Sequence, residues 1–422
     1  MDEQFLHYIW KHQKFEPGKL KLACGKQMLV FNPGSHNQDS GPDFEEARIK
    51  IDNIEWAGQV ELHINSSDWF HHRHQNDTAY DNVILHVVWN HDKEVKVNDE
   101  PLPTLELKEI INPLLVKKYK SYLHAPDEIL CRNQLKDVSS ISINNMLDRV
   151  LVERLEEKAE RILLSLENNY NNWEETTYHV IAGNFGFSTN KDAFERLAKL
   201  LPFSSLKKVL QSPSQTEALL FGQAGFLEKE TDDYQRSLKS EFTYLIKKFQ
   251  LSESMMKAQW KFGKLRPANF PTVRLGQLAS ILSHQPQLFS LLTETESIKE
   301  LKRKLQTPLS EYWQEHYDFG KARSSKSKAI GEKSFENILI NTVAPLLAAY
   351  SKYVGDSKYM DRAIELLESI PKENNRITKK WDDPGLSPKT AFDSQALIQL
   401  FKSYCQKRKC LQCNIGVEIL NK

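Results

Sequence analysis

The segment GPDFEEARIKIDNIEWAGQVELH, residues 41–63, decides the fold of the first part of the chain. Apolar and charged residues alternate on both sides of its centre, over residues 45–52 and 54–65, with the period of β-strands. The Asp52-Asn53 pair between the two runs is a turn signal for a short loop. The pattern therefore predicts an antiparallel hairpin.

The polar residues of this hairpin are candidates for a catalytic metal site. Because strand side chains alternate between faces, Gln59, Glu61 and His63 should point the same way. A hairpin would bring the carboxylates of Asp43 and Glu61 to one end of the sheet, where Mg²⁺ or Mn²⁺ would relieve their repulsion. His63 would be a further ligand, orient a bound water or act as its base. The alternative is that these are strand residues with solvated charges, and that Asp43 forms a turn.

A histidine-rich segment, SSDWFHHRHQNDTAYDNVILHVV, follows the hairpin. Nine of the thirteen histidines lie within the first 91 residues. In the functional interpretation, His74 and His86 lie near the metal or a scissile phosphate and Tyr80 donates a hydrogen bond to that phosphate. In the alternative, His86 is a satisfied core histidine, and His71 and His72 are loop residues.

Length and composition indicate a globular protein with two or three domains. The chain has 422 residues, of which 40% are hydrophobic and 27% are charged. It contains no run of about 18–20 apolar residues, and its N-terminus does not have the pattern of a signal peptide, so we expect no membrane partner and a cytoplasmic location. A net charge of +1 argues against a protein that coats nucleic acid non-specifically, but it allows a positive cleft.

The period of the sequence changes near residue 109. Before this point short strand-like runs dominate, and one of them, NVILHVVW, is apolar enough to be a central strand covered on both faces. After it, apolar residues recur at helical spacing. We therefore expect an α+β domain over residues 1–125, with a mixed sheet and flanking helices, and an all-α region over residues 126–422.

The C-terminus carries a cysteine cluster. Cys405, Cys410 and Cys413 have the spacing C-x₄-C-x₂-C, and the C-x₂-C half is common among metal ligands. Cys131 is the candidate for a fourth ligand. Such a set would hold structural Zn²⁺ or an iron–sulfur cluster with four cysteine ligands. The alternative is a group of reduced thiols without metal.

The segment WKFGKLRPANFPTVRL, residues 260–275, mixes cations with aromatic residues in a bent loop. This combination can contact phosphates and stack on bases. In the alternative, the aromatic side chains anchor the loop in the core and the cations are solvated. The candidate nucleic-acid contacts are Lys261, Lys264, Arg266 and Arg274.

The order of a helix, a strand, the Pro-Asp pair ending at Asp43 and the Glu-Leu-His triplet ending at His63 resembles the PD-(D/E)xK nuclease superfamily. This resemblance covers roughly the first 110 residues and implies a restriction-endonuclease-like fold. It also implies metal coordination by Asp43 and Glu61, with help from Glu3 on the first helix. The superfamily usually has lysine where this chain has His63. Some of these nucleases hold a 4Fe–4S cluster with one upstream and three C-terminal cysteines, an arrangement similar to that seen here.

A second resemblance spans nearly the whole chain. NPGSHNQDSGPDF, GQVELHINSSDWFHHRH and YCQKRKCLQCNIG are similar to an uncharacterised bacterial family, domain of unknown function 2851. The leading hypothesis is a metal-dependent nuclease-like protein that hydrolyses phosphodiester bonds in DNA or RNA. The alternatives are a nucleic-acid-binding protein that has lost catalysis, and a helical scaffold for protein partners with a structural metal site.

Overall fold

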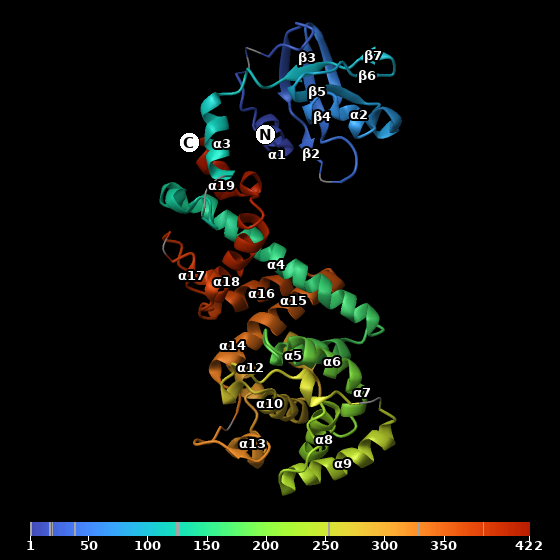
Figure 1. The fold of residues 1–422 in the computed structure, drawn as a ribbon, viewed down its shortest axis with the longest axis vertical. Coiled ribbons are helices and arrows are strands. Elements are labelled where there is room, and N and C mark those ends of the chain that lie inside the picture. Colours follow the sequence, from blue (N-terminus) through green and yellow to red (C-terminus); the bar gives the residue numbers. More distant parts are fainter. Residues whose placement is uncertain are drawn as a thin grey trace. The chain divides into compact units, whose positions relative to one another are not determined.

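The protein divides into two compact units in a computed structural model, which describes residues 2–16, 18, 20–37, 39–123, 127–251, 254–327, 329–382 and 384–422. The first unit comprises Met1–Met146 with Leu400–Lys422, and the second comprises Leu147–Gln399 (Figure 1). The division predicted at residues 125 and 126 differs from this one, because the C-terminal segment packs within the first unit. Residues 124–126 lie outside the described residues.

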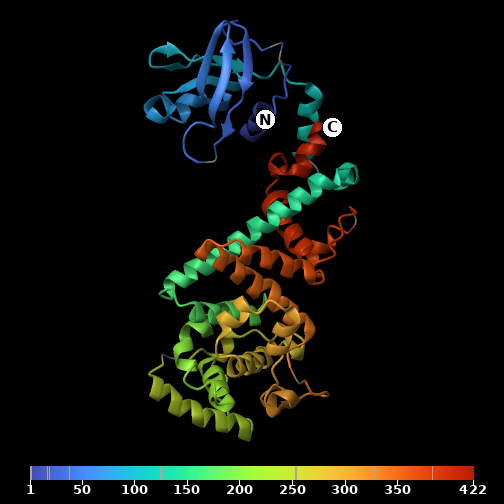
Figure 2. The ribbon, with the colours of Figure 1, turned by 180° about the vertical axis from the view of Figure 1, so that it is seen from behind.

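A mixed β-sheet forms the centre of the first unit (Figures 1 and 2). Its strand order is β1-β3-β4-β5-β8, and β2 pairs with β3. Pairing is antiparallel from β1 through β4, whereas β5 runs parallel to both β4 and β8. The strands are β1 (Met28–Asn32), β2 (Ser35–His36), β3 (Phe44–Ile51), β4 (Ile54–Asn65), β5 (Val83–Asn90) and β8 (Thr104–Glu106).

The predicted hairpin is confirmed as β3 and β4. Ile51 pairs with Ile54 across the Asp52-Asn53 turn, where Asp52 adopts a positive φ of 51°. The prediction of a central strand is also confirmed, because β5 lies between two strands and its first six residues are buried. The β3–β4 hairpin and β5 thus set the register of the part of the sheet that carries the candidate residues.

Helix α1 (Glu3–Lys11) contacts β4. The Asp2 side chain accepts a hydrogen bond from the Phe5 N–H at 2.9 Å, which caps the helix. Its apolar face is buried through Phe5, Leu6, Ile9 and Trp10. The other elements of this unit are α2 (Asp68–His71), η2 (His74–Asn76), η3 (Thr78–Tyr80), β6 (Lys96–Val97), β7 (Glu100–Pro101), α3 (Pro113–Leu123), η4 (Arg132–Asp137), the start of α4 (Ser140–Asn168), η8 (Leu400–Cys405), η9 (Cys410–Gln412) and α19 (Asn414–Asn421).

The C-terminal helix α19 is tied to the first unit by long-range hydrogen bonds. The Tyr8 hydroxyl donates to Asn421 Oδ1 at 2.6 Å, and Lys118 Nζ donates to the carbonyl of Ile419 at 2.6 Å. The Ser139 hydroxyl also donates to a carboxylate oxygen of α19, at 2.7 Å. These contacts explain why the last residues join the first unit and not the helical one.

The second unit is helical apart from the short hairpin of β9 (His316–Asp318) and β10 (Lys321–Ala322). The expected α+β part followed by an all-α part is thus confirmed at this level. No helix within the described residues is both long enough and apolar enough to cross a bilayer. Besides most of α4, the helices are α5 (Trp173–Phe185), α6 (Lys191–Leu200), α7 (Phe203–Leu206), α8 (Pro213–Gln223), α9 (Asp233–Phe249), α10 (Pro271–His284), α11 (Leu288–Glu294), α12 (Ile298–Leu305), α13 (Glu311–Glu315), α14 (Glu332–Ile338), α15 (Ala344–Val354), α16 (Lys358–Ser369), α17 (Arg376–Lys379) and α18 (Ala391–Gln399), with short 3-10 or π segments between them.

Candidate functional site

The carboxylates of Asp43 and Glu61 are brought together by the β3–β4 hairpin. The Asp43 N–H donates to Glu61 Oε2 at 3.1 Å, and the Leu62 N–H donates to Asp43 Oδ2 at 2.9 Å. Each carboxylate therefore accepts a hydrogen bond from the backbone of the opposite strand. Glu61 is 5% exposed, and burial raises the pKa of its carboxyl.

Helix α1 adds two residues to this centre. Glu3 and His7 are four residues apart and so share one face of the helix. His7 Nε2 lies 3.2 Å from Asp43 Oδ2. Burial raises the pKa of Glu3, and the nearby charge of Asp43 raises it further. Glu3 therefore lies close enough to Asp43 for their charges to interact.

His63 lies at the middle of a row of imidazoles. It is 1% exposed, and its Nδ1 is 2.8 Å from His86 Nε2 while its Nε2 is 3.0 Å from His72 Nδ1. Burial, followed by the neighbouring imidazoles, lowers the pKa of His63 to about 2, and burial lowers that of His86 to about 3. Both rings are neutral at pH 7, and each neutral ring offers one donor and one acceptor to this row.

His74 is held next to Glu61 by aromatic packing. Its Nε2 lies 3.3 Å from Glu61 Oε1, and the Tyr80 ring stacks on the imidazole with centroids 3.8 Å apart. Burial and the charges of Glu61 and Asp43 raise the pKa of Tyr80 to about 12. Tyr80 is buried in the same apolar cluster as Trp69, so the ring that stacks on His74 is itself held in place by the core.

Three histidines offer ligand atoms at metal-binding distance. The candidate ligand nitrogens of His63, His72 and His74 all lie within 4.8 Å of one another. The sequence pattern did not single out His72, which it left as a loop residue. The only signal in the sequence was the two-residue spacing between His72 and His74. This spacing does not fix where the His72 ring lies, because the path of the loop depends on Arg73, which adopts a positive φ of 63°.

Gln59 is not brought to the same place. It lies two residues before Glu61, but a register shift follows it in the pairing of β4 with β5. Its side chain lines a separate surface hollow of about 490 Å³ with Glu45 and Arg48. Its Oε1 is buried without a hydrogen-bond partner among the described residues.

The four candidate cysteine ligands lie on elements that pack together in the first unit. Cys131 precedes η4, Cys405 ends η8, Cys410 begins η9 and Cys413 precedes α19. Helix α19 contacts both η4 and η9, and η9 contacts η8. Burial and the nearby thiols raise the pKa of Cys131 to about 12 and that of Cys405 well above its usual value. None of the four forms a disulfide bond.

The basic segment of the second unit divides into an exposed part and a buried residue. Arg274 is 5% exposed, and its guanidinium donates to Gln277 Oε1, Ser334 Oγ and Asn269 Oδ1 at 2.6–2.9 Å. Arg274 therefore holds the loop together and is not available to contact phosphates, because it is buried and both of its terminal nitrogens donate inside the fold. The exposed cations are Lys261, Lys264 and Arg266.

The aromatic residues of this segment anchor it in the core, as the alternative interpretation expected. Trp260 is buried, and its Nε1 donates to the carbonyl of Ala224 at 2.8 Å. The ring of Phe262 packs edge-on against that of Phe270, with centroids 5.1 Å apart. The loop thus holds its cations on an anchored backbone. Trp260 is buried where a nucleic-acid base cannot stack on it.

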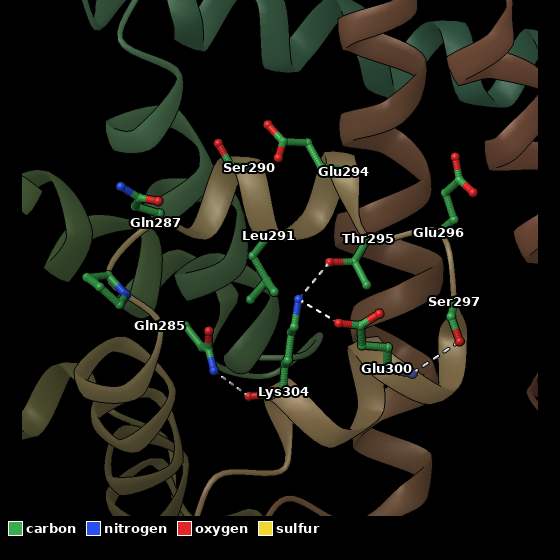
Figure 3. A pocket seen from close by; sticks show the side chains of 11 residues that line it. Gln285, Gln287, Ser290, Leu291, Glu294, Thr295, Glu296, Ser297, Glu300 and Lys304 are labelled. Atoms are coloured by element: carbon green, nitrogen blue, oxygen red, sulfur yellow. Dashed lines mark hydrogen bonds and ion pairs between the residues drawn. The ribbon is translucent and has the colours of Figure 1, made fainter.

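A polar hollow of about 670 Å³ in the second unit was not indicated by any sequence motif (Figure 3). Figure 3 shows Lys304 pointing toward Glu300 and Thr295, with its Nζ 2.9 Å from Glu300 Oε1 and 3.4 Å from Thr295 Oγ1. The Lys304 ammonium group thus contacts residues that themselves line the hollow. Glu294 and Glu296 add negative charge to the lining. This hollow offers neither the imidazoles nor the paired backbone contacts of the β3–β4 centre.

Comparison with known proteins identifies a family but no relative of known activity. Neither the curated proteins nor the solved structures give a significant match. A family model, described as protein of unknown function (DUF2851), matches residues 3–376. The match includes the sheet, the carboxylate–histidine centre and most of the helical unit. The chain therefore belongs to the DUF2851 family.

Proposed function

We propose that this protein is a metal-dependent hydrolase of phosphodiester bonds in DNA or RNA. The proposal rests on the reciprocal contacts of Asp43 and Glu61, which gather two carboxylates where β3 begins beside β4. The resemblance to the PD-(D/E)xK superfamily supports it, as does the charge interaction of Glu3 with Asp43. The membership of a family of unknown function leaves this activity to experiment.

The residues of the centre fit a divalent cation. Carboxylate oxygens of Asp43 and Glu61 would hold Mg²⁺ or Mn²⁺, with Glu3 as a further ligand. When bound, the ion polarises a phosphate oxygen and lowers the pKa of a water ligand. His63 is neutral, so it does not supply the positive charge of the lysine found in the superfamily.

The activity is tested with the full chain on single- and double-stranded DNA and RNA in Mg²⁺ or Mn²⁺. We expect Asp43→Asn and Glu61→Gln to lower the cleavage rate by about 100-fold or more, because both carboxylates would hold the ion that stabilises the charge developing in the reaction. Glu45→Gln is the matched control, since Glu45 is an exposed carboxylate on the same strand. A wild-type chain that shifts these substrates on a gel without cutting them would favour the binding protein, and one that does neither would favour the scaffold.

The exposed cations of the second unit are the proposed phosphate contacts. Lys261, Lys264 and Arg266 lie in one loop whose aromatic side chains are anchored in the core. Such cations position a nucleic acid without reading its sequence. A nucleic-acid substrate without strong sequence preference is consistent with this arrangement.

We also propose that Cys131, Cys405, Cys410 and Cys413 hold a metal that stabilises the C-terminal packing. A tetrahedral Zn²⁺ with bonds of 2.3 Å separates its sulfur ligands by about 3.8 Å. No three of these sulfur atoms, all in the described part of the chain, lie within 4.8 Å of one another. In a 4Fe–4S cluster each sulfur binds its own iron, which needs a wider spacing, so the arrangement favours the cluster over zinc.

The metal of the cysteine cluster is identified by anaerobic purification. We expect a brown protein that contains iron and acid-labile sulfide, and a Cys131→Ser variant that has lost the colour. Cys24→Ser is the matched control because Cys24 is an exposed free thiol outside the cluster. A colourless protein with one zinc per chain would show that the cysteine cluster binds zinc instead.

A further inference from the structure

We propose that His63, His72 and His74 form a site for a first-row transition-metal ion, with Glu61 as its fourth ligand. Their candidate ligand nitrogens lie within 4.8 Å of one another, and Glu61 Oε1 is 3.5 Å from His63 Nε2 and 3.3 Å from His74 Nε2. This inference rests on the proposed function in that it assigns the metal of the same centre. The metal it assigns differs from the Mg²⁺ that the carboxylates alone would select.

Three contacts in this set have close to the spacing found around a single tetrahedral ion, although Glu61 is not part of the group of nitrogens that lie within 4.8 Å of one another. Bonds of 2.0–2.1 Å to imidazole nitrogens place neighbouring ligands about 3.4 Å apart. The distance from His63 Nε2 to His72 Nδ1 is 3.0 Å, and the two distances to Glu61 Oε1 lie on either side of 3.4 Å. Binding would require small shifts of side chains and no rearrangement of the strands.

The surroundings of the three rings are those of metal ligands. A histidine that binds a metal usually bonds through its other nitrogen to a partner that fixes the ring, and His63 Nδ1 is 2.8 Å from His86 Nε2. His74 is held by the stacked Tyr80 ring, yet its Nε2 is buried without an aligned hydrogen bond among the described residues. An ion at this place would replace the contact that His74 Nε2 makes with Glu61 Oε1 at 3.3 Å.

One ligand is open to solvent. His63 and Glu61 are buried, whereas His72 follows α2 and is exposed. The site therefore has a rigid floor on β4 and an accessible side through which an ion and a water can exchange.

The ligand set selects the class of ion. Neutral imidazoles suit Zn²⁺, Fe²⁺, Co²⁺ or Ni²⁺, while Mg²⁺ and Ca²⁺ prefer an all-oxygen shell. Three imidazoles and one carboxylate give a single negative charge against the two positive charges of the ion. The ion and its four ligands thus carry a single net positive charge, which the neighbouring Asp43 carboxylate offsets.

The inference is tested by titrating the chelator-stripped full chain with Co²⁺, without any substrate. We expect one equivalent to give visible d–d absorption of a four-coordinate ion, and Zn²⁺ to abolish it. His72→Gln should weaken Co²⁺ binding by at least about 10-fold, the lower end of what even an outer partner of a ligand costs. His72 is exposed, so this variant is expected to fold as the wild type does.

His71→Gln is the matched control, because His71 is the neighbouring exposed histidine and faces Asp68 at 3.2 Å. It should bind Co²⁺ as the wild type does. Cobalt at the cysteine cluster is recognised by strong near-ultraviolet absorption from thiolate ligands, which His72→Gln should not change. No d–d absorption in the wild type, or equal losses in the two histidine variants, would overturn the inference.

The outcome separates this inference from the proposed function. Normal Co²⁺ binding by a chain that cuts no nucleic acid would support the three-histidine metal site and contradict the proposed nuclease activity. Cleavage with Mg²⁺ by a chain that binds neither Co²⁺ nor Zn²⁺ would leave the nuclease and remove the three-histidine site.

Discussion

Replacing Lys158 with methionine should reverse its effect on stability between pH 7 and pH 10. Lys158 lies on α4 in the second unit, where its Nζ donates to Asn341 Oδ1 at 3.1 Å and to Gln395 Oε1 at 3.0 Å. Burial, followed by the charge of Arg154, lowers the pKa of Lys158 from 10.5 to about 7. The folded chain therefore binds this proton less readily than the unfolded chain.

The sign and size follow from proton linkage. Above pH 10.5 the lysine is neutral in both states and costs nothing. As the pH falls toward 7 the unfolded chain gains a proton that the folded chain does not hold, and stability falls by up to about 1.4 kcal/mol per pH unit. For these two pKa values the penalty is about 4 kcal/mol at pH 7 and about 1 kcal/mol at pH 10.

Methionine removes this penalty and also removes two hydrogen bonds, which are worth about 2 kcal/mol together. Lys158→Met should thus be more stable than the wild type by about 2 kcal/mol at pH 7 and less stable by about 1 kcal/mol at pH 10. Urea unfolding followed by tryptophan fluorescence at intervals between these pH values measures the difference. Lys352→Met is the control, since Lys352 is exposed and pairs with Glu160 at the surface. A difference that stays constant across this range would refute the reasoning.

Three further outcomes are expected. Lys264→Ala should lower the slope of log binding constant against log salt for single-stranded nucleic acid by about 0.7, because one exposed phosphate contact is lost; an unchanged slope would remove this loop from the interface. Tyr80→Leu should weaken Co²⁺ binding by about 10-fold through loss of the ring stacked on His74, whereas Tyr80→Phe should retain binding; equal losses would argue against the stacking. Gly416→Ala should lower the metal content of the cysteine cluster, since its Cβ would lie 2.2 Å from the carbonyl oxygen of Cys410; full occupancy would show that α19 can move.

The hairpin and the meeting of its carboxylates could be predicted from the sequence. The Asp52-Asn53 turn is a local signal, and the register of two paired strands then places residues near Asp43 opposite residues near Glu61. Strand periodicity also places Glu61 and His63 on one face. These features depend on neighbours in the chain, which a pattern in the sequence records.

The imidazole cluster depends on loop geometry that no periodicity records. His72 reaches His63 because α2 ends there and Arg73 adopts a left-handed conformation. His86 reaches His63 because β5 runs parallel to β4, a pairing between strands that are separated by three short helical segments, α2, η2 and η3. A run of histidines shows the residue types but not which ring nitrogens meet.

Long-range packing accounts for the other differences. The return of α19 to the first unit depends on contacts such as that of Tyr8 with Asn421, which lie 413 positions apart. Arg274 looked like a surface cation because charged residues in loops are normally solvated. Its burial required three polar partners from separate positions, and only the folded chain brings them together.

The central claim is that the end of the β3–β4 hairpin holds a metal ion. Anomalous diffraction at the zinc edge, from crystals of the full chain grown with Zn²⁺, tests it most directly. The account predicts one peak within about 2.2 Å of His63 Nε2, His72 Nδ1, His74 Nε2 and Glu61 Oε1. Ordered imidazoles with His63 still bonded to His72, and no peak between them and Glu61, would contradict it.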